Sequence, residues 1–188
     1  MRIIAGKYRG RKLKSPPSLQ TRPTSDRLRE TLFNILAPRI DGARFLDLCA
    51  GSGAVGIEAL SRGAAHVTFV DRSRKMYALI ETNLKSLAVG DDKIESVSKE
   101  ALEFLRKRAK QEGAPFDIIF FDPPYAMDYE AVLDYAGEHA TQMLAESGAM
   151  IVEHHRKKDL KEGFGALKRY RTLKQGDSCL SFYKRTAA

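Results

Sequence analysis

The residues Asp122-Pro123-Pro124-Tyr125 directly follow an apolar run at positions 118–121. They place a carboxylate, a backbone carbonyl and an aromatic ring at the end of a predicted strand. An exocyclic amine on a nucleobase is a poor nucleophile, because its lone pair is delocalised into the ring. Asp122 and the carbonyl of Pro123 can each accept one N–H of such an amine, while Tyr125 lies against the base and the prolines stiffen the turn. The alternative is that the two prolines only end the strand.

A second pattern, Gly51-Ser52-Gly53-Ala54-Val55-Gly56, matches the G-x-G-x-x-G fingerprint between a predicted strand and a predicted helix. Asp71 follows Gly51 by 20 residues, a spacing that fits ribose binding. Taken alone, this pattern suits a nicotinamide-dependent oxidoreductase. Asp47, four residues before Gly51, would repel a pyrophosphate but attract a cofactor that carries an ammonium and a sulfonium. S-adenosylmethionine is such a cofactor.

Positive charge is concentrated at the amino-terminal end of the chain. Residues 1–44 contain 11 Lys and Arg against 3 acids, whereas residues 45–188 contain 21 of each. A basic segment on a neutral body is typical of a protein that binds a polyanion. We predict that phosphates are contacted by Arg2, Lys7, Arg9, Arg11, Lys12, Arg22, Arg27 and Arg29. The alternative is that the first 14 residues form only a flexible, solvated tail.

The composition excludes several other classes of protein. With 188 residues and 43% hydrophobic content, we expect one globular domain with a small appendage. Cys49 and Cys179 lie far apart, and the adjacent His154 and His155 would point to opposite faces of a strand, so we predict neither a disulfide framework nor a metal site. The chain begins without an apolar leader, and no run approaches the roughly 18 residues of a membrane span. We therefore expect a soluble, cytoplasmic protein, with a monomer as the default.

The hydrophobic pattern predicts an arm, one helix, and then alternating strands and helices. Residues 6–13 suit a short hairpin, and a helix of about ten residues ends at Pro38. Strands are predicted at 45–49, 66–71, 94–97, 116–122 and 149–153, with helices at 55–62, 76–87, 101–110 and 129–144, and antiparallel strands at 167–173 and 179–183. This order indicates an α/β fold with a doubly wound, mostly parallel, seven-stranded sheet that binds ligands at the carboxyl ends of its strands. We divide the chain into a basic arm and helix at 1–43 and a catalytic domain at 44–188.

Several segments resemble known families. Residues 45–53 resemble motif I of the class I methyltransferases, and residues 122–125 resemble their amino-methylating (Asp/Asn)-Pro-Pro-(Tyr/Phe) motif. The ribosomal RNA small subunit methyltransferase D family is similar to this chain at residues 2–6, 9–13, 22–24, 26–27 and 29–34. The arm and the 22–34 segment are what select this family, since many amino-methyltransferases share the other two motifs.

This resemblance implies a Rossmann-like class I methyltransferase that moves a methyl group from S-adenosylmethionine to the N2 amine of one guanine in 16S ribosomal RNA. The assembling small ribosomal subunit would be the partner, and S-adenosylhomocysteine the product. The resemblance implies that the cofactor is bound by Asp47, Cys49, Ala50, Gly51, Ser52, Gly53, Asp71, Arg72, Glu100 and Ala101, although Glu100 also suits a helix cap. The guanine would leave its stack and enter the corner formed by Asp122, Pro123, Pro124 and Tyr125.

Other functions are compatible with the same residues. An adenine N6 methyltransferase acting on DNA or RNA could hold its amine in the same corner. A dehydrogenase would use the glycine-rich loop, and a non-catalytic RNA-binding or ribosome-assembly protein would keep only the fold. If the protein transfers methyl groups, Asp122 should act chiefly by positioning the amine and by stabilising charge on it, because attack on a sulfonium needs little acid catalysis.

Overall fold

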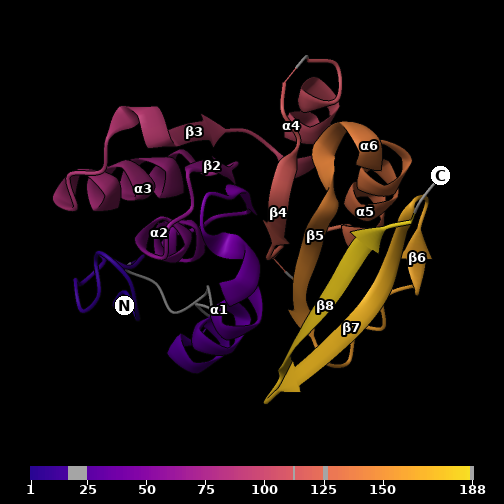
Figure 1. The fold of residues 1–188 in the computed structure, drawn as a ribbon, viewed down its shortest axis with the longest axis horizontal. Helices are drawn as coiled ribbons and strands as arrows, with labels where there is room; N and C mark the ends of the chain where they lie inside the picture. The colour runs from indigo at the N-terminus through magenta and orange to yellow at the C-terminus, as the bar shows by residue number, and fades with distance from the viewer. Residues whose placement is uncertain (17–24, 112, 125–126, 187–188) are drawn as a thin grey trace.

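The computed structural model describes residues 1–16, 25–111, 113–124 and 127–186. Its centre is one eight-stranded sheet with strand order β3-β2-β1-β4-β5-β8-β7-β6 (Figure 1). The first five strands in this order pair in parallel, and β8, β7 and β6 continue the sheet with antiparallel pairing. This arrangement confirms the predicted α/β fold with a mostly parallel sheet and a carboxyl-terminal antiparallel hairpin.

The elements alternate along the chain as the pattern predicts. The strands are β1 Arg44–Leu48, β2 His66–Asp71, β3 Ile94–Ser98, β4 Phe116–Phe121, β5 Leu144–His155, β6 Gly163–Phe164, β7 Leu167–Gln175 and β8 Ser178–Arg185. The helices are α1 Asp26–Ile40, α2 Ala54–Ser61, α3 Arg74–Ser86, α4 Ala101–Arg108, α5 Tyr129–Glu138 and α6 Ala140–Met143, with the 3-10 helix η1 at Asp91–Lys93.

Two hydrophobic layers hold these helices to the sheet. One face of the sheet packs against α1, α2 and α3, with Phe45 and Phe120 at the contact, and the other packs against α4, α5 and α6, with Phe121. Phe120 and Phe121 are adjacent yet belong to opposite layers, because side chains alternate along a strand. Each central strand therefore buries both faces, which explains its nearly continuous apolar sequence.

Some boundaries differ from the sequence prediction. Helix α1 does not end at Pro38 but continues to Ile40. The proline lies in the last turn and removes one helical hydrogen bond, while burial of Leu36 and Ile40 in the core favours the extra turn. The helix predicted at 129–144 divides at His139 into α5 and α6, and β5 begins at Leu144 rather than 149. The two-residue strand β6 was not predicted, so the sheet has one strand more than expected.

The arm, which we define as residues 1–16, is docked on the body. The bridge between Arg2 and Lys12 and the hydrogen bond from Ile3 N to Arg11 O, 3.0 Å, pair residues 1–3 with residues 11–13 rather than forming a hairpin within 6–13. Ile3 and Leu13 are buried in the same hydrophobic layer as α1 and α2. The flexible-tail alternative is therefore wrong for these residues.

Candidate active site

The carboxyl ends of the central strands surround a cavity of about 420 Å³, a size typical of small-molecule and cofactor sites. Of the cofactor residues predicted from the sequence, Gly53 does not line this cavity. The others do: Asp47, Cys49, Ala50, Gly51, Ser52, Asp71, Arg72, Glu100 and Ala101. Asp122, Pro123 and Pro124 line the same cavity. Tyr125 lies outside the described residues. The two motifs, about 70 residues apart in sequence, thus share one site, as expected for parallel strands.

The glycine-rich loop needs its glycines for two different reasons. Gly53 precedes α2 with a φ of 77°, a left-handed conformation that glycine adopts without strain. At Gly56 a Cβ atom would lie 2.3 Å from the ring of Phe69, so the missing side chain lets α2 pack directly on β2. The fingerprint therefore fixes both the turn and the close approach of the helix.

Asp71, at the end of β2, ties the loop to the neighbouring helix. Its Oδ2 accepts a hydrogen bond from Gly51 N at 2.9 Å, and its Oδ1 accepts one from Ser73 N at 2.8 Å. Burial raises the pKa of Asp71, although these two hydrogen bonds oppose the shift. Each carboxylate oxygen can accept a further hydrogen bond, which suits the ribose hydroxyls of a nucleoside.

Asp47, on β1, is the most deeply buried acid of the cavity wall, with 1% of its surface exposed. Its Oδ2 accepts a hydrogen bond from Gly56 N at 2.8 Å. Burial raises its pKa to about 7, the hydrogen bond from Gly56 opposes this shift, and the charge of Asp71 adds to it. A buried carboxylate of this kind is stabilised by a cationic ligand, so the residues present fit the ammonium end of S-adenosylmethionine.

Hydrogen bonds to β1 and α5 hold the catalytic corner predicted after β4. Asp122 N donates to Leu48 O at 3.3 Å, and the hydroxyl of Tyr129 donates to Pro123 O at 3.2 Å. Tyr129 is buried at the start of α5, and the Nζ of Lys158 lies 3.6 Å from its ring centroid. A carbonyl has two lone pairs, so Pro123 O can accept from Tyr129 and still accept one N–H from a base.

The end of β5 also belongs to this site, although no pattern in the sequence was used to predict it. Glu153, His154 and His155 line the cavity, together with Ser178 at the start of β8. A signal was available, because Glu153 is an acid at the carboxyl end of a predicted parallel strand, as are Asp71 and Asp122. The histidines had been considered only as metal ligands.

The arm also reaches the cofactor loop, through the buried side chain of Asn83 on α3. Its Oδ1 accepts from Lys14 N at 2.9 Å, and its Nδ2 donates to Lys14 O at 3.1 Å and to Ser52 O at 3.0 Å. Met1 and Pro16 line the cavity. The basic segment therefore forms part of the wall of the site, which no pattern in the sequence indicates.

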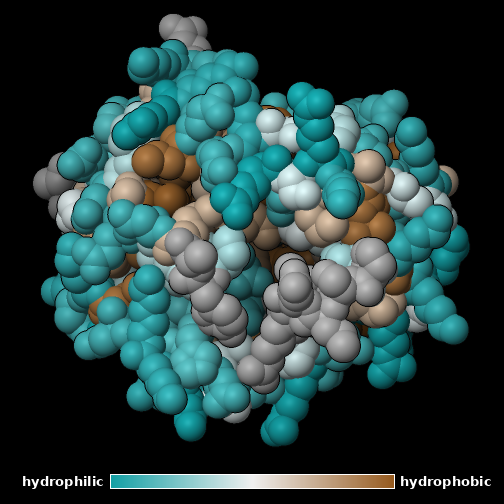
Figure 2. Space-filling model, turned by 180° about the vertical axis from the view of Figure 1, so that it is seen from behind, coloured by the Kyte–Doolittle hydropathy of each residue, from teal (hydrophilic) through white to brown (hydrophobic). Residues whose placement is uncertain are grey.

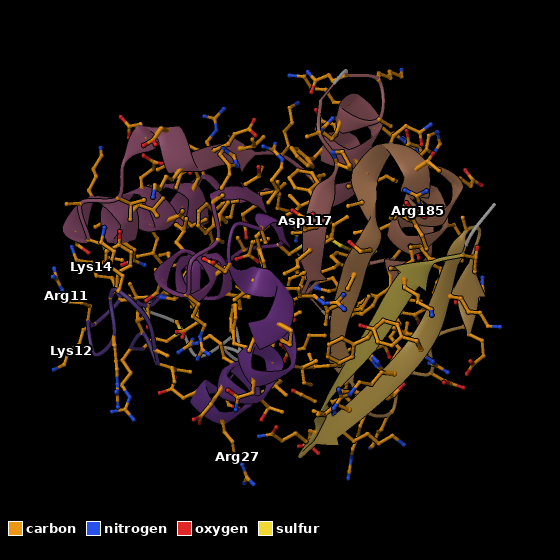
Figure 3. All side chains as sticks on the ribbon, viewed as in Figure 1. Arg11, Lys12, Lys14, Arg27, Asp117 and Arg185 are labelled. Atoms are coloured by element: carbon orange, nitrogen blue, oxygen red, sulfur yellow. The ribbon has the colours of Figure 1, made fainter. Side chains whose placement is uncertain are left out.

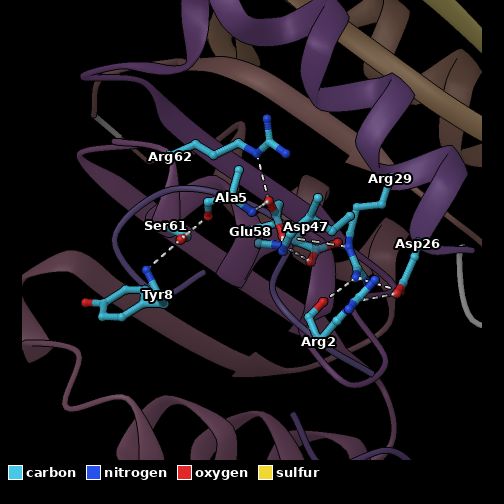
Figure 4. Close-up of polar contacts among 11 residues, drawn as sticks. Arg2, Ala5, Tyr8, Asp26, Arg29, Asp47, Glu58, Ser61 and Arg62 are labelled. Atoms are coloured by element: carbon cyan, nitrogen blue, oxygen red, sulfur yellow. Dashed lines mark hydrogen bonds and ion pairs between the residues drawn. The ribbon is translucent and has the colours of Figure 1, made fainter. Parts of the chain in front are cut away.

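Glu58, in the middle of α2, fastens the first residues of the arm (Figure 4). It is fully buried, and its carboxylate accepts from Ile4 N at 2.8 Å and Ala5 N at 3.0 Å. Arg62 donates to it at 2.7 Å, and the Nε of Arg29 lies 3.9 Å from it. The carboxylate thus satisfies backbone donors of the arm while it balances buried positive charge.

Arg29 was predicted to contact RNA phosphates, but the structure buries its side chain. Its side chain is 0% exposed, and its Nη2 donates to Arg2 O at 2.6 Å and to Asp26 Oδ1 at 3.0 Å. Burial lowers the pKa of Arg29, and the neighbouring Glu58 and Asp26 oppose that shift. The prediction that Arg29 contacts RNA is wrong in this structure, because the guanidinium joins α1, α2 and the arm instead.

The other predicted phosphate contacts within the described residues are exposed: Arg2, Lys7, Arg9, Arg11, Lys12 and Arg27. Figure 3 shows that Arg11 and Lys12 project outward from the arm and that Arg27 extends from α1 into solvent. Arg2 is 3.6 Å from Asp26, and Arg11 donates to Ser86 O at 2.7 Å. Arg22 lies outside the described residues, so its contact stays a prediction.

Within residues 1–16, 25–111, 113–124 and 127–186, no group of three or more His, Cys, Asp or Glu is placed to hold a metal ion. No helix in the same part of the chain is long and apolar enough to cross a membrane. The face opposite to that of Figure 1 is mostly hydrophilic, with hydrophobic residues in small, separate patches (Figure 2).

Comparison with known proteins identifies the family. The family model described as Conserved hypothetical protein 95 matches residues 1–184. The chain is 41% identical over 186 residues to "Putative rRNA methyltransferase YlbH" of Bacillus subtilis (strain 168), covering 98% of this chain and 99% of that protein. It is 48% identical over 125 residues to "Ribosomal RNA small subunit methyltransferase D" of Escherichia coli (strain K12), covering 66% of this chain and 60% of that protein.

A solved structure agrees with this result. "Putative methyltransferase yhhF from Escherichia coli" superposes with a TM-score of 0.85 at 36% identity, covering 100% of this chain and 99% of that chain. The structure of "SMU.776, a putative methyltransferase complexed with SAH" superposes with a TM-score of 0.66 at 18% identity, covering 83% of this chain and 49% of that chain, which shows the shared fold alone. The chain has the class I methyltransferase fold and belongs to the family described as Conserved hypothetical protein 95, together with the ribosomal RNA small subunit methyltransferase D proteins.

Proposed function

We propose that the protein transfers a methyl group from S-adenosylmethionine to the exocyclic N2 amine of one guanine in 16S ribosomal RNA. The observation that carries this proposal is that Asp122 and Pro123 line the same cavity as Asp47 and the glycine-rich loop. The names of the relatives support a ribosomal RNA substrate rather than hydride transfer. The proposal includes the assembling small subunit as partner, a cytoplasmic location and a monomeric enzyme.

The cofactor end of the cavity is acidic, which suits a cationic ligand. Bound S-adenosylmethionine supplies an electrophilic methyl group on a sulfonium. Asp47 would hold the ammonium, Asp71 would accept from the ribose hydroxyls, and Glu100 with Ala101 would contact the adenine. Glu100 lies 3.3 Å from Arg72, so the arginine holds the carboxylate at the cavity rim.

The substrate end of the cavity holds the base by hydrogen bonding. Asp122 and Pro123 O each accept one N–H of the amine, which turns its lone pair out of the ring plane and toward the methyl group. The Asp122 carboxylate also stabilises the positive charge that develops on the nitrogen. Tyr129 keeps the Pro123 carbonyl in place through its 3.2 Å hydrogen bond.

The exposed cations of the arm and Arg27 contact RNA phosphates. Phosphate contacts give affinity and orientation without reading the sequence. The target guanine is splayed from its stack before it reaches the corner at Asp122, since a stacked and paired base cannot present its amine there.

The first experiment measures transfer of labelled methyl from S-adenosylmethionine to small ribosomal subunits and naked RNA from cells that lack the enzyme. The modified nucleoside is identified by mass spectrometry. We expect N2-methylguanosine. N6-methyladenosine would favour the adenine-modifying alternative, and an absence of label with folded protein would favour the RNA-binding protein without catalysis.

Substitution Asp122→Ala tests the catalytic corner. We expect kcat to fall by at least about 100-fold, a loss typical of removing one group that stabilises the transition state, while the Kd for S-adenosylmethionine stays within about twofold. Asp122→Asn, which keeps one carbonyl acceptor, should retain more activity than alanine. Asp134→Asn, at an exposed position on α5, is the matched control. Equal turnover by Asp122→Ala and the parent would remove the carboxylate from the mechanism.

A further inference from the structure

Glu153 lies beside Asp122 at the carboxyl edge of the sheet. Strands β4 and β5 are parallel, and their last registered pair at this end is Phe121 with Val152. Asp122 directly follows β4 and Glu153 is the next residue of β5, and neighbouring strands lie about 4.8 Å apart. Both residues line the cavity. The acid that holds the reacting amine in the proposed mechanism therefore has a second acid as its neighbour.

The sheet register also gives the direction of the two side chains. Phe120 and Ile151 pair in register and belong to the hydrophobic layer against α2. Asp122 and Glu153 lie two residues further along, so they point to the same side of the sheet. Asp47 pairs with Phe120 and shares that side. Carboxylates of β1, β4 and β5 thus follow one another along the cavity, from its cofactor end toward β8.

Strand β8 orients the Glu153 carboxylate. Glu153 pairs with Leu180 across β5 and β8, and only 8% of its surface is exposed. The hydroxyl of Ser178 donates to its Oε1 at 3.2 Å. A carboxylate offers about four acceptor positions, so Glu153 can accept a hydrogen bond from a base as well.

Guanine and adenine differ at the edge that would meet this pair of acids. Guanine presents the N1–H beside its N2 amine, and both are donors. Adenine presents an acceptor at N1 beside its N6 amine, and that lone pair would face a carboxylate. A second carboxylate beside Asp122 is therefore complementary to guanine and unfavourable for adenine.

We propose that Glu153 accepts the N1–H of the target guanine while Asp122 and Pro123 hold the N2 amine, and that Glu153 thereby selects guanine over adenine. This inference rests on the proposed function, because it assumes that a guanine amine occupies the corner. It assigns base selection to β5, whereas the methyl-transfer motif lies after β4.

The test compares guanine with 2-aminopurine at the target nucleotide, in small subunits reconstituted with the substituted RNA. 2-Aminopurine keeps the reacting amine at C2 but has an acceptor in place of the N1–H. We expect the unaltered protein to show a kcat/KM at least about tenfold higher for guanine, because the analogue leaves a charged acceptor without its donor. Equal kcat/KM values for the two bases would overturn the proposal.

The variant Glu153→Gln separates recognition from the intrinsic reactivity of the amine. Its amide can donate to N1 of 2-aminopurine, so we expect the guanine to 2-aminopurine ratio to fall at least about fivefold, with the KM for S-adenosylmethionine unchanged. Glu146→Gln, an exposed glutamate at the other end of β5, should keep the parent's ratio. An unchanged ratio in Glu153→Gln would also overturn the proposal.

Failure of this inference can be distinguished from failure of the proposed function. If guanine is methylated at N2 but the ratios do not respond to Glu153, only the role of Glu153 is wrong. If the product is N6-methyladenosine, the proposed base is wrong and the inference fails with it. If Glu153→Gln does not fold, equal kcat/KM values of the unaltered protein for the two bases would still overturn the proposal.

Discussion

Asp47 combines nearly complete burial with a place on the cavity wall, and these two properties conflict unless a cation is bound. Burial raises the pKa of Asp47 to about 7, well above the ordinary value of a carboxyl group. An ammonium ligand stabilises the ionised form and lowers this pKa, so binding releases a proton when the free protein starts protonated. The residue therefore links cofactor affinity to pH near neutrality.

We predict that affinity for S-adenosylmethionine falls as the pH drops below about 7, by up to about tenfold per pH unit. Calorimetric titration between pH 5.5 and 8.5, in buffers of different ionisation enthalpy, measures both the affinity and the proton release. The variant Asp47→Asn should bind weakly and without this pH dependence. Affinity that does not change across this range would contradict the assigned role.

The same residue also affects stability. Since the folded pKa is raised above the unfolded one, protonated Asp47 favours the folded state at low pH, and that contribution is lost as the pH rises through about 7. Asp47→Asn should therefore raise the Tm of the free protein at pH 8 although it impairs binding. A Tm below that of the parent at pH 8 would argue against a desolvated carboxylate.

Residue types at strand ends could be predicted from the sequence, but burial of charge could not. Asp47, Asp71 and Asp122 follow from strand–turn–helix spacing, and the structure places all of them on the cavity. Arg29 was misassigned because its charge was read without its helical position. It lies at helical spacing from the buried Phe33 and Leu36, on the core side of α1, and that spacing was the signal that it is buried.

At the scale of elements, α2 connects the cofactor loop to the arm. Its first residues follow the glycine-rich loop, its middle carries Glu58, and its end carries Ser61, whose carbonyl and hydroxyl accept from Lys7 N and Tyr8 N. The boundaries of α2 were predicted to within one residue. The contact between α2 and the arm was not predicted, because periodicity within a helix does not reveal which distant segment packs against it.

We predict that Glu58→Gln destabilises the protein by about 3–5 kcal/mol, because it removes the negative charge that faces the buried guanidinium of Arg29. This corresponds to a Tm lower by about 6–20 °C in a domain of this size. Thermal unfolding followed by circular dichroism measures the change. Glu30→Gln, exposed on α1, is the control. A shift no larger than that of Glu30→Gln would show that the cluster contributes little to stability.

At the scale of the whole molecule, the positive charge is held on a fixed surface. The arm displays Lys7, Arg9 and Lys12 to solvent, while its apolar residues and backbone are bound to the body. Deleting the arm would leave Glu58 without its backbone donors and open the cavity beside Met1. Neutralising the charges is therefore a cleaner test of RNA binding than deletion.

We predict that the double variant Lys7→Gln, Lys12→Gln weakens RNA binding and reduces the slope of log K against log salt by about 1.4–1.8, since each phosphate contact contributes roughly 0.7–0.9. Binding titrations at several salt concentrations measure this slope. The control pair Lys107→Gln, Lys110→Gln removes equal charge from the last turn of α4 and from the turn that follows it. If both pairs change the slope equally, net charge rather than the arm governs binding.

The docking of the arm has a consequence for the order of folding. The arm precedes the side chains that bind it, which are at positions 58, 61 and 83 and lie 53 to 69 residues further along the chain. Contacts between such distant positions form only after the intervening chain is available. During synthesis the arm must therefore wait for α2 and α3 to leave the ribosome, so it reaches its native place only after residues far behind it in the chain have been made.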